Sequence, residues 1–122
     1  MESKIINTAA HIAHPITLPN LKQGKRIHWH PKAGHCIIIF TLADADGHHV
    51  HYTTETHIEV PAGTDIGTQL HQCNEILRLS AVMFGAFMRE QTGADNDFTF
   101  TLTQEEFIGA IVDSSEDEVH DV

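Results

Sequence analysis

The sequence has few cysteines and no long hydrophobic run, and each shortage excludes a class of protein. Its two cysteines, Cys36 and Cys73, both stand in apolar segments, so two reduced core thiols are favoured over a disulfide. The apolar run around residues 37–40 is far shorter than the roughly 20 residues of a membrane-spanning helix, so no membrane association is expected. The first residues lack the basic start and apolar stretch of a secretion signal, which predicts a cytoplasmic location.

Basic residues are scarce in the chain and missing from its C-terminal third. Lys and Arg number 7 against 17 Asp and Glu, and residues 90–122 contain acids but neither Lys nor Arg. The formal net charge of -10 therefore arises entirely from that third. A duplex-binding protein normally shows a basic face, so direct nucleic-acid binding is not expected. An acidic surface can instead bind a protein partner that has a basic surface.

The composition is that of a globular protein. Of the 122 residues, 41% are hydrophobic and 20% are charged, which fits one domain with a core of its own. We therefore expect a single α+β domain over residues 1–113. Residues 114–122 have almost nothing to bury, which predicts a mobile acidic tail.

The N-terminal part of the chain predicts two extended segments. Pro15 and Pro19 remove backbone donors, so the first segment is expected to be extended or looping, and at best an edge strand. In residues 25–30, Ile27 and Trp29 alternate with polar side chains, which is typical of a half-buried strand.

Two further strands are predicted around one turn. Residues 35–42 are apolar at both odd and even positions. This indicates a central strand covered on both faces, or one whose second face meets another subunit. The dipeptide Asp46-Gly47 then predicts a hairpin turn, because such turns need positive φ angles. The strand that follows is expected over residues 48–60.

That strand separates its side chains into a packing face and a polar face, because side chains alternate along a strand. The even positions form the face that can pack: Val50, Tyr52, Thr54, Thr56, Ile58 and Val60. The odd positions point the other way: His49, His51, Thr53, Glu55, His57 and Glu59. The histidines are therefore expected on the polar face and not in the core.

A long helix is predicted over residues 65–93. Apolar residues recur there at helical spacing: Ile66, Leu70, Cys73, Leu77, Phe84 and Met88. Thr64 or Thr68 can cap its start, and Gly93 can end it.

The second half of this helix is apolar on more than one side. Leu79, Val82 and Ala86 lie off the main stripe, so a second covering surface is expected. A partner subunit supplies such a surface most simply, which predicts a homodimer or higher homo-oligomer. The alternative is a monomer in which the N-terminal segment or the last helix covers this side.

The C-terminal part predicts one more strand and a short helix. Phe98, Phe100 and Leu102 alternate with threonines over residues 97–102. Thr103 and Glu106 have the spacing of a capping box, in which each side chain satisfies a backbone amide of the other residue. The buried side of the helix that follows is expected to contain Phe107, Ile108, Ile111 and Val112. The predicted fold class is thus α+β, with a three- to four-stranded antiparallel sheet packed by one long helix, plus a C-terminal strand, a short helix and an acidic tail.

A metal site is the most specific chemistry that the sequence offers. His49, His51 and Glu55 form an H-x-H-x3-E pattern on one strand face, where two imidazoles and a carboxylate can bind a divalent metal ion. His57 can join them, and so can His28 and His30 if their strand lies beside this one. Two alternatives are a solvated or oligomer-lining histidine face and an interface that responds to pH near the imidazole pKa.

The same histidines resemble part of the first cupin motif, and Pro61-Ala-Gly63 is similar to part of the second. The histidine that the second motif requires after Gly63 is missing, and a helical pattern stands where barrel strands belong. The chain is therefore not assigned to the cupins. A glycine-rich phosphate loop, a nucleophile elbow and cysteine pairs at zinc spacing are also missing from the sequence.

Two functional hypotheses follow. The first is a small acidic interaction protein without catalysis, which binds and inhibits or regulates a protein partner. Phage-encoded anti-defence proteins and immunity proteins are similar in size and charge. Its partner-binding residues are expected in the acidic third: Glu105, Glu106, Glu116, Asp117 and Glu118. The second hypothesis is a metal-dependent enzyme or metal-binding protein that uses His49, His51 and Glu55.

Overall fold

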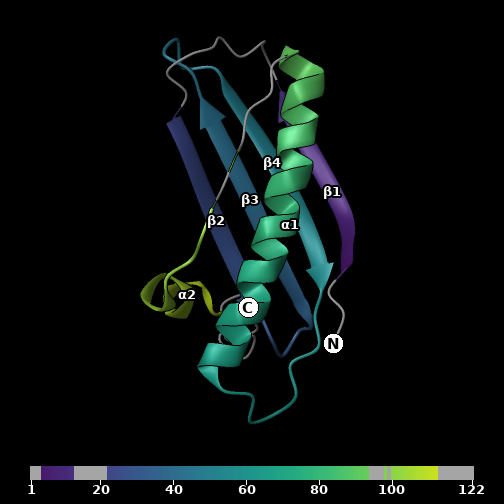
Figure 1. The fold of residues 1–122 in the computed structure, drawn as a ribbon, viewed down its shortest axis with the longest axis vertical. Coiled ribbons are helices and arrows are strands. Elements are labelled where there is room, and N and C mark those ends of the chain that lie inside the picture. The colour runs from purple at the N-terminus through teal and green to yellow at the C-terminus, as the bar shows by residue number, and fades with distance from the viewer. Residues whose placement is uncertain (1–3, 13–21, 94–97, 99, 113–122) are drawn as a thin grey trace, which may run out of the picture.

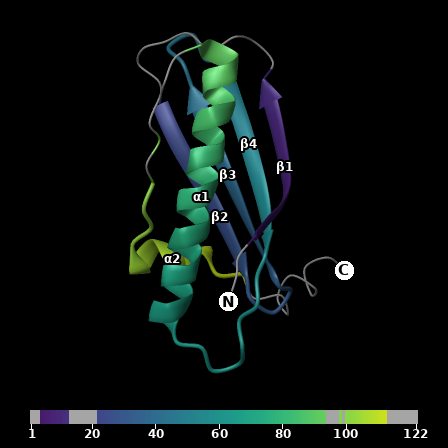
Figure 2. The same ribbon diagram turned by 45° about the vertical axis from the view of Figure 1, so that its right-hand side comes forward.

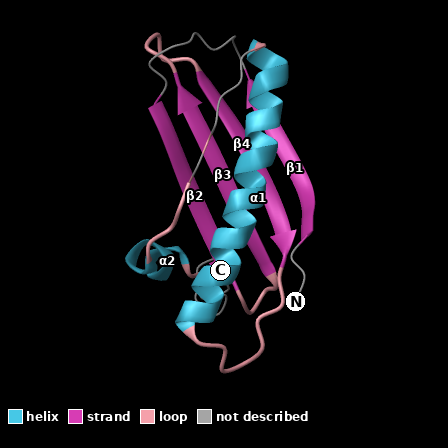
Figure 3. Ribbon diagram, in the orientation of Figure 1, coloured by secondary structure: helices cyan, strands magenta, loops and turns pink. Residues whose placement is uncertain are grey.

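Four strands and two helices make up the fold, a computed structural model that describes residues 4–12, 22–93, 98 and 100–112 (Figure 1). The strands are β1 (Lys4–Ile12), β2 (Lys22–His30), β3 (His35–Ala43) and β4 (His49–His57). The helices are α1 (Ile66–Thr92) and α2 (Gln104–Ala110). Both helices lie on the same side of the sheet (Figures 2 and 3). The α+β class predicted from the sequence is confirmed.

The sheet is antiparallel, with the strand order β1-β4-β3-β2. The N-terminal segment is the edge strand that the sequence allows, and it pairs with β4 rather than with its neighbour in sequence. The doubly apolar segment becomes β3, which is central as predicted. Gly47 has φ 85 in the turn between β3 and β4, a conformation that glycine adopts without steric cost.

Helix α1 has a different N-cap from the two predicted from the sequence. The cap is Asp65, whose carboxylate accepts hydrogen bonds from the backbone N–H of Thr68 at 3.0 Å and from its hydroxyl at 2.7 Å. Thr64 instead donates its hydroxyl to a backbone carbonyl. A carboxylate is at least as good a cap as a hydroxyl, because it accepts both bonds and also suits the positive end of the helix dipole. The predicted end at Gly93 is confirmed by its φ of 74.

The core lies between α1 and the even-numbered side chains of β3 and β4. The sheet contributes a fully buried set: Cys36, Ile38, Phe40, Leu42 and Val50. Helix α1 contributes another: Cys73, Ile76, Leu77, Phe84 and Met88. The rings of Phe40 and Phe84 stack with centroids 5.1 Å apart. The predicted separation of β4 into a packing face and a histidine face is confirmed, since Val50, Thr54 and Thr56 are all buried. Within the described residues, neither helix is long and apolar enough to cross a membrane.

The C-terminal segment packs as predicted but forms no strand at its described residues, 98 and 100–102. The side chain of Asn74 on α1 takes the place of a strand partner. It accepts a hydrogen bond from the backbone N–H of Leu102 at 2.9 Å and donates one to the carbonyl of Leu102 at 3.2 Å. Phe98 and Leu102 are buried, and Phe100 packs on Phe40. In this segment the alternating apolar residues are therefore buried, but the backbone does not pair with the sheet.

Helix α2 begins with the predicted capping box of Thr103 and Glu106. Phe107 is fully buried against Trp29, at a centroid distance of 5.5 Å. The expectation for Ile108 is wrong, because its side chain is 53% exposed. The helix ends at Ala110, and the extended residues after it meet β2, where the backbone N–H of residue 112 donates to the carbonyl of Trp29 at 2.8 Å.

Two buried threonines on β4 predict opposite responses to the same substitution. The hydroxyl of Thr54 hydrogen-bonds Ser80 of α1 at 3.0 Å, whereas Thr56 Oγ1 has no partner among the described residues. Thr54→Val leaves the buried Ser80 hydroxyl unpaired, so it is expected to lower the free energy of unfolding by about 1–3 kcal/mol. Thr56→Val removes an unpaired hydroxyl and is expected to be neutral or stabilising. Urea denaturation of both variants measures the contrast, and equal losses of stability would contradict it.

Candidate functional site on the open face of the sheet

The face of the sheet opposite to α1 is not covered by any described helix (Figure 2). We call it the open face. It carries the odd-numbered side chains of β3 and β4 and the even-numbered side chains of β2, as the burial of their neighbours shows. Ile37 and Ile39 lie half-buried at its centre. Histidines stand around them: His28, His30, His35, His49, His51 and His57. For β4, the alternation of side chains along the sequence predicted that the histidines lie on this face.

The predicted metal ligands lie on the open face but not together. The rings of His49 and His51 are 6.2 Å apart and stacked. Glu55 is four residues beyond His51 on the same strand, which places it about 13 Å away along the strand. In the register, Glu55 faces Ile37 on β3. The structure therefore brings the two imidazoles close and leaves the carboxylate apart, and metal binding by this set stays a prediction.

His51 lines a hollow of about 280 Å³ that the sequence did not reveal. The other lining residues are Gly24, Lys25, Arg26, Ile39 and Thr41. A Cβ atom on Gly24 would lie 2.7 Å from Thr41 Oγ1, so a larger residue there would collide with Thr41. The hollow depends on the pairing of three strands, which no local pattern shows. A guanidinium, a hydroxyl and an imidazole can together accept a small anion.

The turn between β3 and β4 holds the closest group of potential metal ligands among the described residues. Asp44, Asp46 and His48 each offer one ligand atom, and these atoms lie within 4.8 Å of one another. The carboxylate of Asp44 is already used by the turn. It accepts hydrogen bonds from the backbone N–H groups of Asp46 and His48, both at 2.9 Å, and its other oxygen is 3.1 Å from His48 Nδ1. The group is therefore a candidate metal triad whose hydrogen bonds also close the hairpin.

The cysteines are not candidate nucleophiles. Both are buried in the core as thiols and form no disulfide, as the sequence predicted. The hydrogen bond to Cys73, with burial, raises the pKa of the Cys36 thiol far above its ordinary value. A thiol nucleophile acts as the thiolate, so Cys36 is inert at neutral pH.

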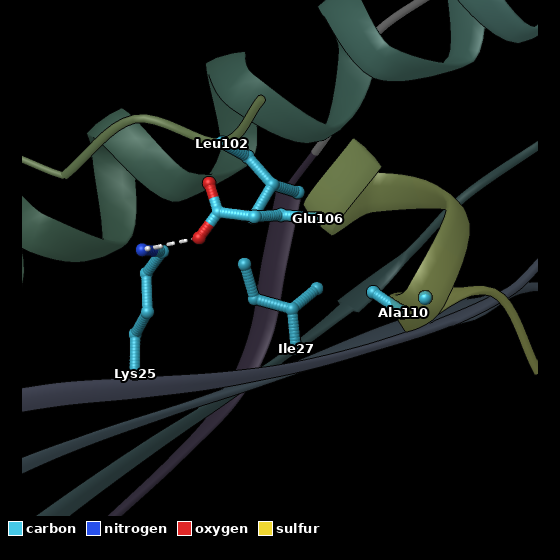
Figure 4. A pocket seen from close by; sticks show the side chains of 6 residues that line it. Lys25, Ile27, Leu102, Glu106 and Ala110 are labelled. Carbon is cyan, nitrogen blue, oxygen red and sulfur yellow. Dashed lines mark ion pairs between the residues drawn. The ribbon is translucent and has the colours of Figure 1, made fainter. Parts of the chain in front are cut away.

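The described acidic residues predicted to bind a partner, Glu105 and Glu106, stand exposed on the first turn of α2. Glu106 pairs with Lys25 of β2 at 3.5 Å, and both side chains line a hollow of about 350 Å³ (Figure 4). Ile27 and Ala110 line the same hollow. Glu116, Asp117 and Glu118 lie outside the described residues.

A second surface stands on the outer side of α1. Val82 is 64% exposed, and Leu79 and Met83 are also exposed. Beside them is a mainly apolar hollow of about 370 Å³ between α1 and the C-terminal segment, which Val82, Phe98 and Phe100 line. Arg78 and Glu75 form an ion pair of 3.1 Å at its edge. We call this surface the α1 patch.

Comparisons of the chain with protein-family models, with curated proteins and with solved structures found no match.

The capping role of Glu106 predicts a pH dependence. Hydrogen bonds from Thr103, then the charge of Lys25, hold the pKa of Glu106 below its ordinary value of 4.5. Because the folded-state pKa is lowered, the stabilisation is complete above pH 4.5 and is lost as the pH falls through the lowered value. Glu106→Gln keeps a capping side chain but cannot titrate, so its stability should decrease less on acidification than that of the wild type.

Thermal unfolding from pH 6 to about pH 3 measures this difference. The matched control is Glu105→Gln, since Glu105 precedes the capping position on the same turn. Identical acid sensitivity of Glu106→Gln and the wild type would refute the capping role.

Proposed function

We propose that the protein is a non-catalytic interaction protein that inhibits or regulates a protein partner with a basic surface. The observation that carries the proposal is the α1 patch. Leu79, Val82 and Met83 are exposed on the outer side of α1, whereas the inner side of this helix packs in the core. Clustered apolar side chains on an exposed helix face are typical of a surface that binds another protein.

The hollow beside the α1 patch can receive a side chain of a partner. Phe98 and Phe100 form one wall and Val82 forms the other, so an apolar side chain of a partner can enter between α1 and the C-terminal segment. Anchor residues in such hollows usually dominate the energy of a protein–protein interface. The two hydrogen bonds between the Asn74 side chain and the backbone of Leu102 hold the C-terminal segment against α1. The hollow is therefore present before a partner binds.

The charge of the chain favours one kind of partner. The net charge of -10 comes from residues 90–122, and the α1 patch lies between Glu75 and Glu90, both exposed. Arg78 is the positive charge within the patch, and Glu75 neutralises it. Two copies of this chain, each with a formal net charge of -10, would repel each other as they approach. A basic partner gains attraction from the same charges, so it is the occupant that we favour over a second copy.

Substitution in the patch tests the proposal directly. Val82→Asp places a charge where an apolar anchor is expected, so it should weaken capture of the partner by at least about tenfold. The control is Gln91→Asp, which adds the same charge at an exposed polar position of the same helix. Quantitative mass spectrometry of proteins bound to each immobilised variant measures the effect.

A supporting result is a protein that binds the wild type and Gln91→Asp but not Val82→Asp, and that binds again as a purified protein. Identical captured sets for all three would refute the proposal. Sedimentation equilibrium identifies the competing occupant: a dimer that Val82→Asp dissociates would show that a second copy covers the patch.

The acidic third should set the salt dependence of the same binding. Replacing Glu116, Asp117 and Glu118 by their amides removes three negative charges at once. The association rate with the purified partner should fall, and its decrease with added salt should become less steep. Stopped-flow measurements at several salt concentrations compare this variant with the wild type. Equal rates and slopes would show that these acids do not contribute to binding.

Metal binding is the second candidate function. It is favoured by the gathering of histidines on the open face, where their imidazoles neighbour one another within strands and between them.

A further inference from the structure

Three histidines form a row across the open face, which local sequence patterns do not show. His30 is the last residue of β2, His35 is the first of β3, and His57 is the last of β4. The register pairs His30 with His35 and His35 with His57. All three alternate with buried neighbours, so their side chains project from the same face of the sheet. We call them the histidine row.

The spacing within the row suits a shared ligand. Directly opposed residues of an antiparallel pair have Cα atoms about 4.5–5.5 Å apart, which is within the reach of an imidazole. The rings of His30 and His35 already lie with centroids 4.5 Å apart and tilted by 47°. His28 stacks on His30 at 6.3 Å and stands on the same face. Three imidazoles can therefore approach one point above His35, with His28 at one side.

The backbone under the row is held in place by the hairpin between β2 and β3. The N–H of Gly34 donates to the carbonyl of His30 at 2.9 Å, and the carbonyl of Gly34 accepts from the N–H of Ile58 at 2.9 Å. These bonds connect the three strand ends that carry the row. A ligand set on paired strands needs only side-chain rotation to close on an ion, and the backbone does not have to reorganise.

We propose that the histidine row is a binding site for a divalent transition-metal ion of the zinc class. Three neutral imidazoles suit zinc, copper or nickel, and zinc commonly takes three protein ligands and one water. Among the described residues, only the turn group at Asp44, Asp46 and His48 already has three ligand atoms within 4.8 Å. The ligand atoms of the histidine row are farther apart than this, so zinc binding there requires the imidazole rings to rotate about χ1 and χ2. The side chain of His57 is exposed and therefore has room to rotate.

The other two metal candidates are weaker for reasons of geometry. The turn group would have to share the Asp44 carboxylate with the backbone bonds that close the hairpin. His49 and His51 supply two imidazoles, and Glu55 is distant along the strand. The row is the candidate with three ligands of one kind in adjacent register positions. This proposal is independent of the α1 patch and its partner.

Zinc titration of the full-length, untagged chain tests the proposal. Zinc chloride is added in competition with a chromogenic chelator, and the wild type is expected to bind about one ion per chain. His35→Ala and His57→Ala should each weaken binding by at least about tenfold, because each removes a ligand from the coordination shell. The matched control is His71→Ala, an exposed histidine of α1 outside the three candidate metal sites, and it should bind zinc like the wild type. His51→Ala, from the other histidine pair of β4, and Asp46→Ala, from the turn, identify which candidate site holds the ion, and the proposal predicts that neither weakens binding.

Each other outcome overturns the proposal. A wild type that binds no zinc in competition with the chelator excludes a site. Loss of zinc with His51→Ala moves the ion to the predicted pair on β4, and loss with Asp46→Ala moves it to the turn. Far-UV circular dichroism checks that each variant is folded. If His35→Ala does not fold, His57→Gln replaces it, because His57 is exposed and Gln keeps its size and polarity.

Discussion

The packing of one long helix against the two central strands is the contact on which the structure depends. Helix α1 buries its inner stripe on β3 and β4, and the aromatic rings of Phe40, Tyr52 and Phe84 fill the space between the layers. A two-layer fold of this kind has one helix layer for a whole sheet. In the part of the chain that the structure describes, two surfaces therefore stay uncovered: the open face of the sheet and the outer side of the helix. Both candidate functions are located on these two surfaces.

The two surfaces differ in chemistry, and the difference separates the functions. The open face has a small apolar centre, Ile37 and Ile39, surrounded by imidazoles that can act as metal ligands. The outer side of α1 has exposed aliphatic side chains with carboxylates nearby, and no histidine lies between Leu79 and Ala86. A protein partner on the helix and an ion on the sheet would not compete for the same residues. The two proposals can thus both hold or fail separately.

Local sequence patterns were sufficient to predict most of the fold. Alternation in β2 and β4, the capping box at Thr103 and the helix end at Gly93 depend on residues near one another in sequence, so the sequence predicted them. The strand proposed over residues 97–102 was not found at its described residues, because Asn74 satisfies the backbone of Leu102 from another element. A hydrogen bond between residues so far apart in the chain leaves no local signal.

The candidate sites were predictable to a smaller extent, for the same reason. The parity of β4 placed His49 and His51 on a polar face, and the apolar residues off the main stripe indicated the α1 patch. The hollow above Gly24 and the histidine row depend on which residues face each other across three strands. Register is a property of the whole sheet, so one strand's sequence cannot specify it.

The residues after α2 also protect an edge of the sheet. Strand β2 is an outer strand, and unpaired backbone groups on such strands can recruit strands of other molecules and start aggregation. At one end of β2, Ile111 forms a parallel bridge with Trp29. At the other end, Lys22, Lys25 and Arg26 place positive charges along the strand. Residues 111 and 112 and the charges of Lys22 and Arg26 thus hinder the pairing of an incoming strand with this edge.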